Sequence, residues 1–193
     1  MEHWTQTAFV GGHSALDFLN TVGDHGKTRN SSRIADWESF VSWSQAAGLF
    51  SEYELRALAT MGGREERRAK LAEIHNLREI AHAVLRAIAA RTAPPEMALK
   101  TLEDSIKSAL ARASLTTRSN GFEWSVRTDD PDWMIDALGL AVENLLRTVD
   151  LERLCECGRC TWLFIDRGRG AGRRWCDMRT CGNRAKAEAF RKH

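Results

Sequence analysis

The sequence predicts a mainly α-helical protein, with a multi-helix N-terminal domain that carries a small β-hairpin and a cysteine-rich module behind it. Through most of residues 1–150, apolar residues recur every three or four positions, as on one face of a helix. One short stretch, Ser119 to Val126, changes to a period of two, as in a strand. All five cysteines lie between Cys155 and Cys181. We therefore divide the chain into a helical domain, residues 1–150, and a C-terminal module, residues 151–193.

Composition places the chain among ordinary globular proteins, with 43% hydrophobic and 28% charged residues. It has no apolar run of about 18 residues, so we expect no membrane span. The N-terminus lacks a basic segment followed by an apolar one, and we therefore expect a cytoplasmic protein. In a reducing compartment, an odd and clustered set of cysteines favours metal ligation over a disulfide framework.

Charge is distributed unevenly along the chain. The net charge is only +2, but residues 151–193 hold 11 Lys and Arg against 5 Asp and Glu, a balance of +6. Residues 1–150 keep 17 basic against 21 acidic groups, a balance of −4. A polyanion such as nucleic acid would be drawn to the C-terminal module.

The first predicted helix follows the flexible Gly11-Gly12 pair and runs from His13 to Val22, with Ser14 as its cap. Leu16 and Leu19 share its apolar face. Its polar residues, Asp17, Asn20 and Thr21, have two interpretations. They form hydrogen bonds with the main chain at the C-terminal end of their own helix, or they face a ligand pocket that would bind a small-molecule effector.

The next elements follow from capping patterns. Gly23 to Ser32 is polar and predicts a loop, and Asp36 predicts the start of a helix that ends at Gly48. Ser51 and Glu54 form a capping box at the start of the following helix, which ends near Gly62-Gly63.

The longest predicted helix runs from Arg64 to Arg91, with apolar residues three or four positions apart. His75 and His82 lie on or beside this apolar face. No third ligand lies at a supporting spacing, so a pair of core or surface histidines is favoured over metal ligation.

Pro94-Pro95 ends that helix and opens the next, whose apolar stripe we extend to Leu115. The turn at Asn120-Gly121 and the alternating Phe122, Trp124 and Val126 then predict a hairpin that covers one edge of the bundle. A last helix begins after the acidic cap at 129–132 and ends near Asp150. Its predicted inward residues are Ile135, Leu138, Val142, Leu145 and Leu146.

The cysteine spacing predicts one structural zinc site. Cys157 and Cys160 can place two sulfurs on one tight turn, and Cys176 and Cys181 form a second pair. No histidine lies between Cys155 and Cys181, so a four-sulfur site is favoured. Cys155 is the alternative to Cys157 as first ligand, although Cys157 gives the usual spacing.

The residues between the two pairs predict a treble-clef-like zinc finger. Trp162 to Ile165 has strand-forming residues, Arg167 to Gly172 can turn, and Arg173 to Trp175 returns as the second strand. A helix from Asn183 to Arg191 follows Cys181. Such a small module has little core without its metal.

This module resembles the CGNR zinc finger family, whose naming motif stands here as Cys181-Gly182-Asn183-Arg184. The upstream chain resembles the helical ABATE domain, through Leu16 to Thr21, the segment Asp36 to Trp43, and Leu77-Arg78-Glu79. The resemblance implies a stress-induced transcription regulator, with a finger that binds DNA and a helical domain that senses a signal.

The basic residues of the finger are our candidates for nucleic-acid contact, because guanidinium groups bind phosphates and guanine. Asn183 and Arg184 are the candidates for base edges, although Asn183 has helix capping as an alternative role. The set is Arg169, Arg173, Arg174, Arg179, Asn183, Arg184, Lys186 and Arg191.

We therefore expect a zinc-dependent DNA-binding regulator, which forms a homodimer because one finger makes a small footprint. The alternative is a finger that binds RNA or a protein. An enzyme is not expected, because the sequence supplies no nucleophile–base pair and no open metal site.

Overall fold

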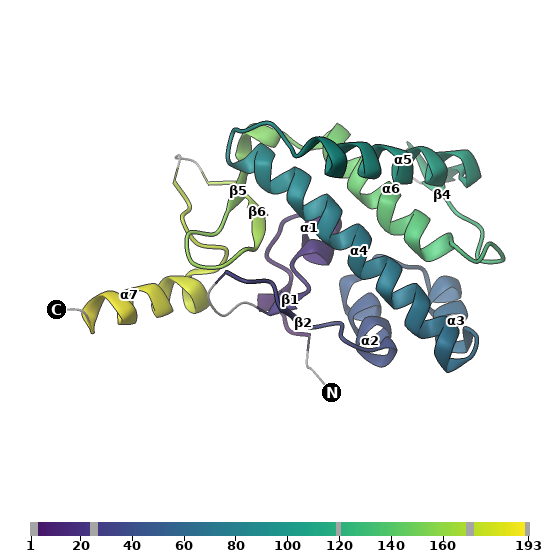
Figure 1. Cartoon of the computed structure of the whole chain (residues 1–193), viewed down its shortest axis with the longest axis horizontal. Coiled ribbons are helices and arrows are strands. Elements are labelled where there is room, and N and C mark those ends of the chain that lie inside the picture. The colour runs from purple at the N-terminus through teal and green to yellow at the C-terminus, as the bar shows by residue number, and fades with distance from the viewer. Residues whose placement is uncertain (1–3, 24–26, 119–120, 169–171, 192–193) are drawn as a thin grey trace.

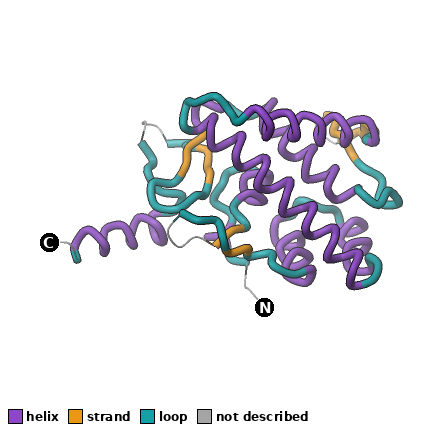
Figure 2. The backbone as a smooth tube through the Cα atoms, in the orientation of Figure 1, coloured by secondary structure: helices purple, strands orange, loops and turns teal. Residues whose placement is uncertain are grey.

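A computed structural model describes residues 4–23, 27–118, 121–168 and 172–191 (Figure 1). It confirms a mainly helical chain, and its seven α-helices within these ranges are α1 Ser14–Leu19, α2 Trp37–Ala47, α3 Glu52–Thr60, α4 Arg64–Ala89, α5 Glu96–Arg112, α6 Trp133–Thr148 and α7 Asn183–Phe190. Three antiparallel strand pairs join them: β1 Val22–Gly23 with β2 Ser31–Ser32, β3 Ser114–Arg118 with β4 Gly121–Ser125, and β5 Leu154–Glu156 with β6 Leu163–Ile165 (Figure 2).

The predicted caps of α2 and α3 are present. The Asp36 side chain accepts a hydrogen bond from the Ser39 amide, and α2 ends at Gly48, whose φ of 62° suits glycine. Ser51 and Glu54 form the complete capping box of α3. The cap of α1 was assigned wrongly, because the Nδ1 atom of His13 rather than Ser14 accepts the Ala15 amide.

Helix α4 crosses the whole helical domain and packs against α1, α5 and α6 (Figure 1). Its buried residues repeat every three or four positions, as predicted, and include Ile74, Leu77 and Leu85. Aromatic rings from the neighbouring segments fill the core beside it. Phe18 lies 5.8 Å from Trp43 between ring centroids, and Phe50 lies 5.3 Å from Trp133. Tilted and edge-on contacts of this kind add to the area that the rings bury.

The predicted hairpin exists, but its first strand and its packing differ from expectation. Leu115 lies in β3 and not in the preceding helix, and its side chain is 57% exposed. Phe122 is also exposed, so these side chains do not cover the bundle edge. Asn120 lies outside the described residues. A period of two therefore located a strand correctly but could not say which face would be buried.

Helix α6 begins at Trp133 as predicted and buries Leu138, Val142 and Leu145, whereas Ile135 and Leu146 are only partly buried. The described residues include no helix with the length and apolar character needed to cross a membrane.

The C-terminal module is built onto the helical domain. Leu154, Leu163 and Ile165, from β5 and β6, belong to the same hydrophobic core as α1, α4 and α6. Helix α7, in contrast, projects from the molecule beyond this core and buries none of its side chains (Figure 1). The base of the module is therefore fixed to the bundle, and its terminal helix is left exposed.

Candidate metal centre and nucleic-acid interface

Four buried cysteines meet at the base of α7. The sulfurs of Cys157, Cys160, Cys176 and Cys181 all lie within 4.8 Å of one another. The Cys160 and Cys176 sulfurs are 3.7 Å apart, and those of Cys176 and Cys181 are 3.6 Å apart. A tetrahedral zinc ion with Zn–S bonds of about 2.3 Å requires sulfurs about 3.8 Å apart. The residues therefore fit one zinc ion, with all four positions filled by protein.

The geometry excludes Cys155 from this set. Cys155 lies in β5 opposite Phe164, and its sulfur points to the Arg153 carbonyl oxygen at 3.6 Å. Burial raises the pKa of its thiol, followed by the charge of Asp166. The first ligand is therefore Cys157, the alternative that the spacing favoured.

A cation is needed to keep these four cysteines ionised together. Contacts with Cys157, and next with Cys176, raise the pKa of the Cys160 thiol. Adjacent thiolates repel one another inside a protein, and a doubly charged metal relieves this repulsion. The electrostatics and the geometry agree on a structural metal centre.

The predicted hairpin of the finger was assigned wrongly. β6 pairs with β5, which precedes the first ligand, and Arg173 to Trp175 forms no strand. The tight turn that carries Cys157 and Cys160 is therefore the loop of the β5–β6 hairpin. The later segment is held by one main-chain bond, from the Gly158 amide to the Arg174 carbonyl oxygen at 2.8 Å. A side chain at Gly158 would meet the Trp175 ring at 3.1 Å.

Two carboxylates that the sequence analysis missed organise the second half of the finger. Asp166 accepts the amides of Gly168 and Arg173, at 2.9 and 3.1 Å, and these bonds lower its pKa. Asp177 accepts the amides of Arg179 and Thr180 and so caps the single π-helical turn Met178–Gly182 that carries Cys181. An aspartate just before a glycine-rich segment or a helical turn is the pattern that could have identified them.

Arg173 serves the finger itself. Its guanidinium donates to the carbonyl oxygens of Trp175, at 3.0 Å, and Cys176, and lies 4.4 Å from the Phe164 ring centroid. Replacing it would disturb the backbone around a zinc ligand. This differs from the nucleic-acid contact that we predicted for it.

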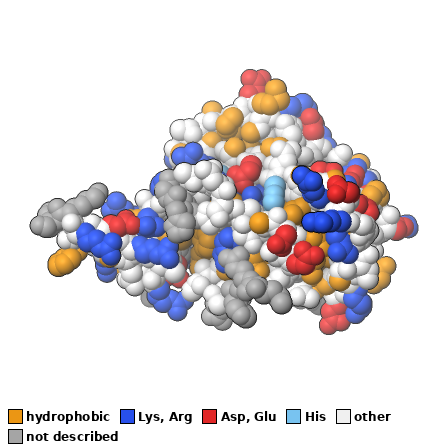
Figure 3. All heavy atoms as spheres, turned by 60° about the horizontal axis from the view of Figure 1, so that its bottom comes forward, with side chains coloured by type: hydrophobic (Ala, Val, Ile, Leu, Met, Phe, Trp, Pro, Cys, Tyr) orange, Lys and Arg blue, Asp and Glu red, His pale blue; other side chains and the backbone are white. Residues whose placement is uncertain are grey.

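The other predicted basic residues are more exposed. The Arg174 guanidinium lies 4.8 Å from the Trp175 ring centroid, and Arg179 is 3.8 Å from Asp177 with a side chain that is 77% exposed. Arg184, Lys186 and Arg191 are exposed on or just after α7. Figure 3 shows Lys and Arg side chains gathered around this projecting end of the molecule.

Asn183 is the first residue of α7 and donates to the Arg179 carbonyl oxygen at 3.2 Å, so its side chain serves the preceding turn. Arg169 lies outside the described residues. The sequence analysis also missed Arg159, whose Nε atom is 3.2 Å from the Glu188 carboxylate. This ion pair ties α7 to the zinc turn.

The finger is joined to the helical domain directly beside the zinc site. The Asn20 amide group both donates to the Leu163 carbonyl oxygen and accepts the Leu163 amide, at 2.8 and 2.9 Å. The Trp162 indole donates to the Val22 carbonyl oxygen at 2.8 Å. Asn20 is 1% exposed, so this residue, for which a ligand pocket was one of our two interpretations, is a buried structural contact instead.

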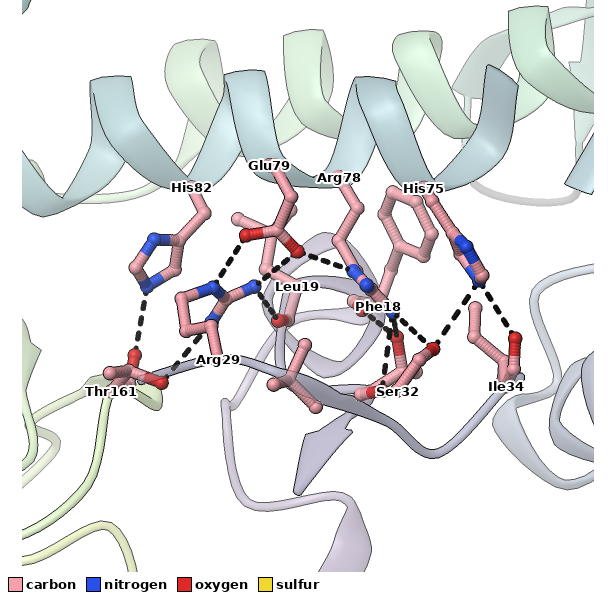
Figure 4. Close-up of polar contacts among 12 residues, drawn as sticks. Phe18, Leu19, Arg29, Ser32, Ile34, His75, Arg78, Glu79, His82 and Thr161 are labelled. Carbon is pink, nitrogen blue, oxygen red and sulfur yellow. Dashed lines mark hydrogen bonds and ion pairs between the residues drawn. The ribbon is translucent and has the colours of Figure 1, made fainter. Parts of the chain in front are cut away.

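A partly buried ion-pair network extends this junction to α4 (Figure 4). Arg29 donates to Glu79 at 2.7 Å, to the Leu19 carbonyl oxygen at 3.0 Å and to Thr161 at 3.3 Å. Glu79 also accepts from Arg78 at 2.8 Å. Thr161 follows the zinc ligand Cys160 directly. The network therefore connects the core of the helical domain to the zinc turn.

Thr21 belongs to the same network. It donates to the Phe18 carbonyl oxygen at 2.7 Å and accepts from Arg78 at 3.1 Å, so it closes α1, as one of our two interpretations held. Burial raises the pKa of Glu79, but its bonds to Arg29 and Arg78 outweigh burial and hold that pKa below its usual value. We infer that Glu79 is ionised and balances two buried guanidinium groups.

The two histidines of α4 hold neighbouring segments rather than a metal. His82 faces the Thr161 carbonyl oxygen at 2.9 Å, and His75 faces that of Ile34 at 2.8 Å. Burial, followed by the charge of Arg29, lowers the pKa of His82 to about 4. At neutral pH His82 is therefore uncharged and donates its ring N–H to Thr161.

Asp17 faces the backbone instead of a cavity, because its Oδ1 atom accepts the Gly11 amide at 2.9 Å. Burial raises its pKa from the ordinary value of 3.8 to about 6. The unfolded chain thus loses this proton at lower pH than the folded chain. The contribution of Asp17 to stability falls as pH rises from about 4 to about 6, and the loss persists above that range.

Replacing Asp17 by asparagine is expected to stabilise the protein at pH 7.5 by about 2 kcal/mol, because the amide can accept the same hydrogen bond without a buried charge. At pH 4 the gain should disappear. Urea denaturation of both proteins at the two pH values measures the difference, and an equal effect at both would contradict the assigned pKa.

Comparison with protein families confirms both resemblances. The profile of the ABATE family, described as "Putative stress-induced transcription regulator", matches residues 12–150, and that of the CGNR zinc finger matches residues 153–193. No curated protein matches the chain. The first profile contains the junction residues Asn20, Thr21, Arg78 and Glu79, and the second contains all four zinc ligands.

Proposed function

Because this chain belongs to the ABATE family and ends in a CGNR zinc finger, we propose that it is a DNA-binding regulator of transcription that acts under stress. Its finger binds DNA through basic side chains, and its helical domain receives the signal or forms a dimer. We further propose a binding protein rather than an enzyme, since the metal has four cysteine ligands and no open position.

The observation that carries the proposal is the exposed helix α7 at the zinc site. It projects from the core (Figure 1), and Lys and Arg side chains gather at this end of the molecule (Figure 3). Arg184 and Lys186 on the helix and Arg191 just after it are exposed to solvent. The one acidic residue of α7, Glu188, is paired with Arg159. A helix with cationic side chains and no buried residues suits insertion into a DNA groove or contact with phosphates.

Replacing Arg184, Lys186 and Arg191 together by alanine is expected to weaken binding to duplex DNA of any sequence by on the order of tenfold or more. If each side chain neutralises one phosphate, the slope of log affinity against log salt should become shallower by about 3. Fluorescence anisotropy with a labelled duplex, measured across a range of salt concentrations, tests this.

The matched control replaces three exposed basic residues of the helical domain, Arg56 of α3 and Lys100 and Lys107 of α5. This variant should bind DNA as the wild type does. Equal weakening in both variants would mean that only net charge matters. Tighter binding to structured RNA than to duplex DNA would favour the RNA alternative over this proposal.

A single finger has a small footprint, so site-specific binding requires a second copy of the chain in this proposal. Sedimentation equilibrium should then show dimers in the concentration range where specific binding occurs. Specific binding by a protein that sediments as a monomer would contradict the homodimer.

A further inference from the structure

A groove of about 1000 Å³ lies in the helical domain, away from the junction and from Asn20 and Thr21. Its floor is one face of α6, formed by Ala137, Leu140 and Ala141. Its walls come from the β3–β4 hairpin and from the start of α3, which lie at the end of the bundle opposite α7 (Figure 1). This volume is sufficient for a drug-sized molecule.

The walls gather exposed apolar side chains. Leu115 and Trp124 are paired across β3 and β4, and Phe122 lies two residues before Trp124 on the same face of the hairpin. Tyr53 completes the wall from α3. These four are 41–72% exposed and make up half of the eight large exposed hydrophobic side chains in the described chain. A soluble protein rarely gathers such side chains without a partner for them.

The rim of the groove is acidic. Four carboxylates line it, from Glu54, Glu123, Asp129 and Glu143, against two guanidinium groups, from Arg127 and Arg147. Arg127 is paired with Asp129, and Arg147 with Glu143, so these two pairs cancel and the four carboxylates against two guanidinium groups leave a net charge of −2 on the lining. His13 also lines the groove, but burial lowers its pKa, so it carries no charge at neutral pH. The groove as a whole therefore attracts cations.

We propose that this groove binds amphipathic organic cations that carry aromatic groups. The apolar floor and walls bury the body of such a molecule, while the rings of Trp124, Phe122 and Tyr53 and the acidic rim attract its charge. If the helical domain senses a signal, as we propose, such a cation is the kind of ligand that it would sense. Only this sensing role rests on the proposed function. Binding by the full chain without DNA tests the groove separately from the finger.

Two ions of the same shape and opposite charge, tetraphenylphosphonium and tetraphenylborate, are the probes. Isothermal titration calorimetry on the zinc-loaded full-length chain should show the cation binding at least about tenfold more tightly than the anion. Trp124→Ala and Phe122→Ala should each weaken binding of the cation by about tenfold or more, and Glu54→Gln should narrow the ratio of cation affinity to anion affinity.

The control is Met97→Ala, which removes a side chain that is 78% exposed on α5 outside the groove. It should leave binding unchanged, and thermal unfolding should show that every variant remains folded. Equal affinity for both ions would overturn the charge preference, and undiminished binding by Trp124→Ala would overturn the site. The wild-type chain could instead form a dimer that binds neither ion and that Trp124→Ala dissociates. This result would overturn the proposal and assign the groove to a second copy of the chain. None of these outcomes depends on whether the finger binds DNA.

Discussion

Replacing Cys160 by serine is expected to abolish zinc binding and to destabilise the whole chain, not only its C-terminal part. The loss should exceed about 4 kcal/mol, as for other structural metal sites. The reason is that Cys160 ends the tight turn between β5 and β6, whose Leu154, Leu163 and Ile165 lie in the main hydrophobic core. Zinc content per chain and urea denaturation followed by circular dichroism measure both effects.

Cys155→Ser is the matched control, because Cys155 lies in the same hairpin but outside the metal cluster. It should retain one zinc ion per chain and change stability by less than about 1 kcal/mol. Cys160→Ser could instead lose its zinc while its helical domain unfolds at the same urea midpoint as in the wild type. The finger would then fold independently, and this result would contradict a core shared with the helical domain.

Replacing Glu79 by alanine is expected to cost about 3 kcal/mol of stability, because it leaves the guanidinium groups of Arg29 and Arg78 buried without a counter-charge. The side chains of Arg29 and Arg78 are only 11% and 5% exposed. The carboxylate is itself 43% exposed, and water that replaces it will reduce the cost below that of a fully buried pair.

Glu73→Ala provides the comparison, since Glu73 lies on the same helix with a similar exposure of 50% and is paired with Lys70. Removing the Glu73 carboxylate should lower the free energy of unfolding by less than about 1 kcal/mol, as for other surface ion pairs. If both variants lost the same stability, the network would be an ordinary surface feature. Because Arg29 contacts Thr161 beside a zinc ligand, Glu79→Ala should also weaken zinc affinity, measured by competition with a chelator, whereas Glu73→Ala should not.

Most local patterns predicted their elements correctly, because the interaction that they require is itself local, although the cap of α1 is His13 and not Ser14. Asp36 and the Ser51–Glu54 pair cap their helices as predicted, because a cap bonds to amides two or three residues away. The spacing of Cys157 and Cys160 similarly predicts two sulfurs on one turn, which requires no distant partner. The metal and its ligand set could therefore be predicted, apart from the choice between Cys155 and Cys157.

Patterns that depend on distant partners were less informative. The strand at Leu163–Ile165 was predicted, but its partner was not, because β pairing joins segments that the spacing alone does not relate. Asn20 and Thr21 could be recognised as polar residues beside an apolar face. Whether they faced a ligand or the protein itself depended on partners far along the chain: Leu163 of the finger lies 143 residues from Asn20, and Arg78 of α4 lies 57 residues from Thr21.

The sequence by itself thus determined a mainly helical chain, a four-cysteine zinc finger and a basic C-terminal module, since these follow from periodicity, spacing and composition. Tertiary structure alone decided that the finger shares the core of the helical domain and that Arg173 serves the finger's own backbone. It also placed the groove, which unites α3, the hairpin and α6. The reason is that burial and hydrogen-bond partners depend on tertiary packing, which brings together residues that lie far apart in the sequence.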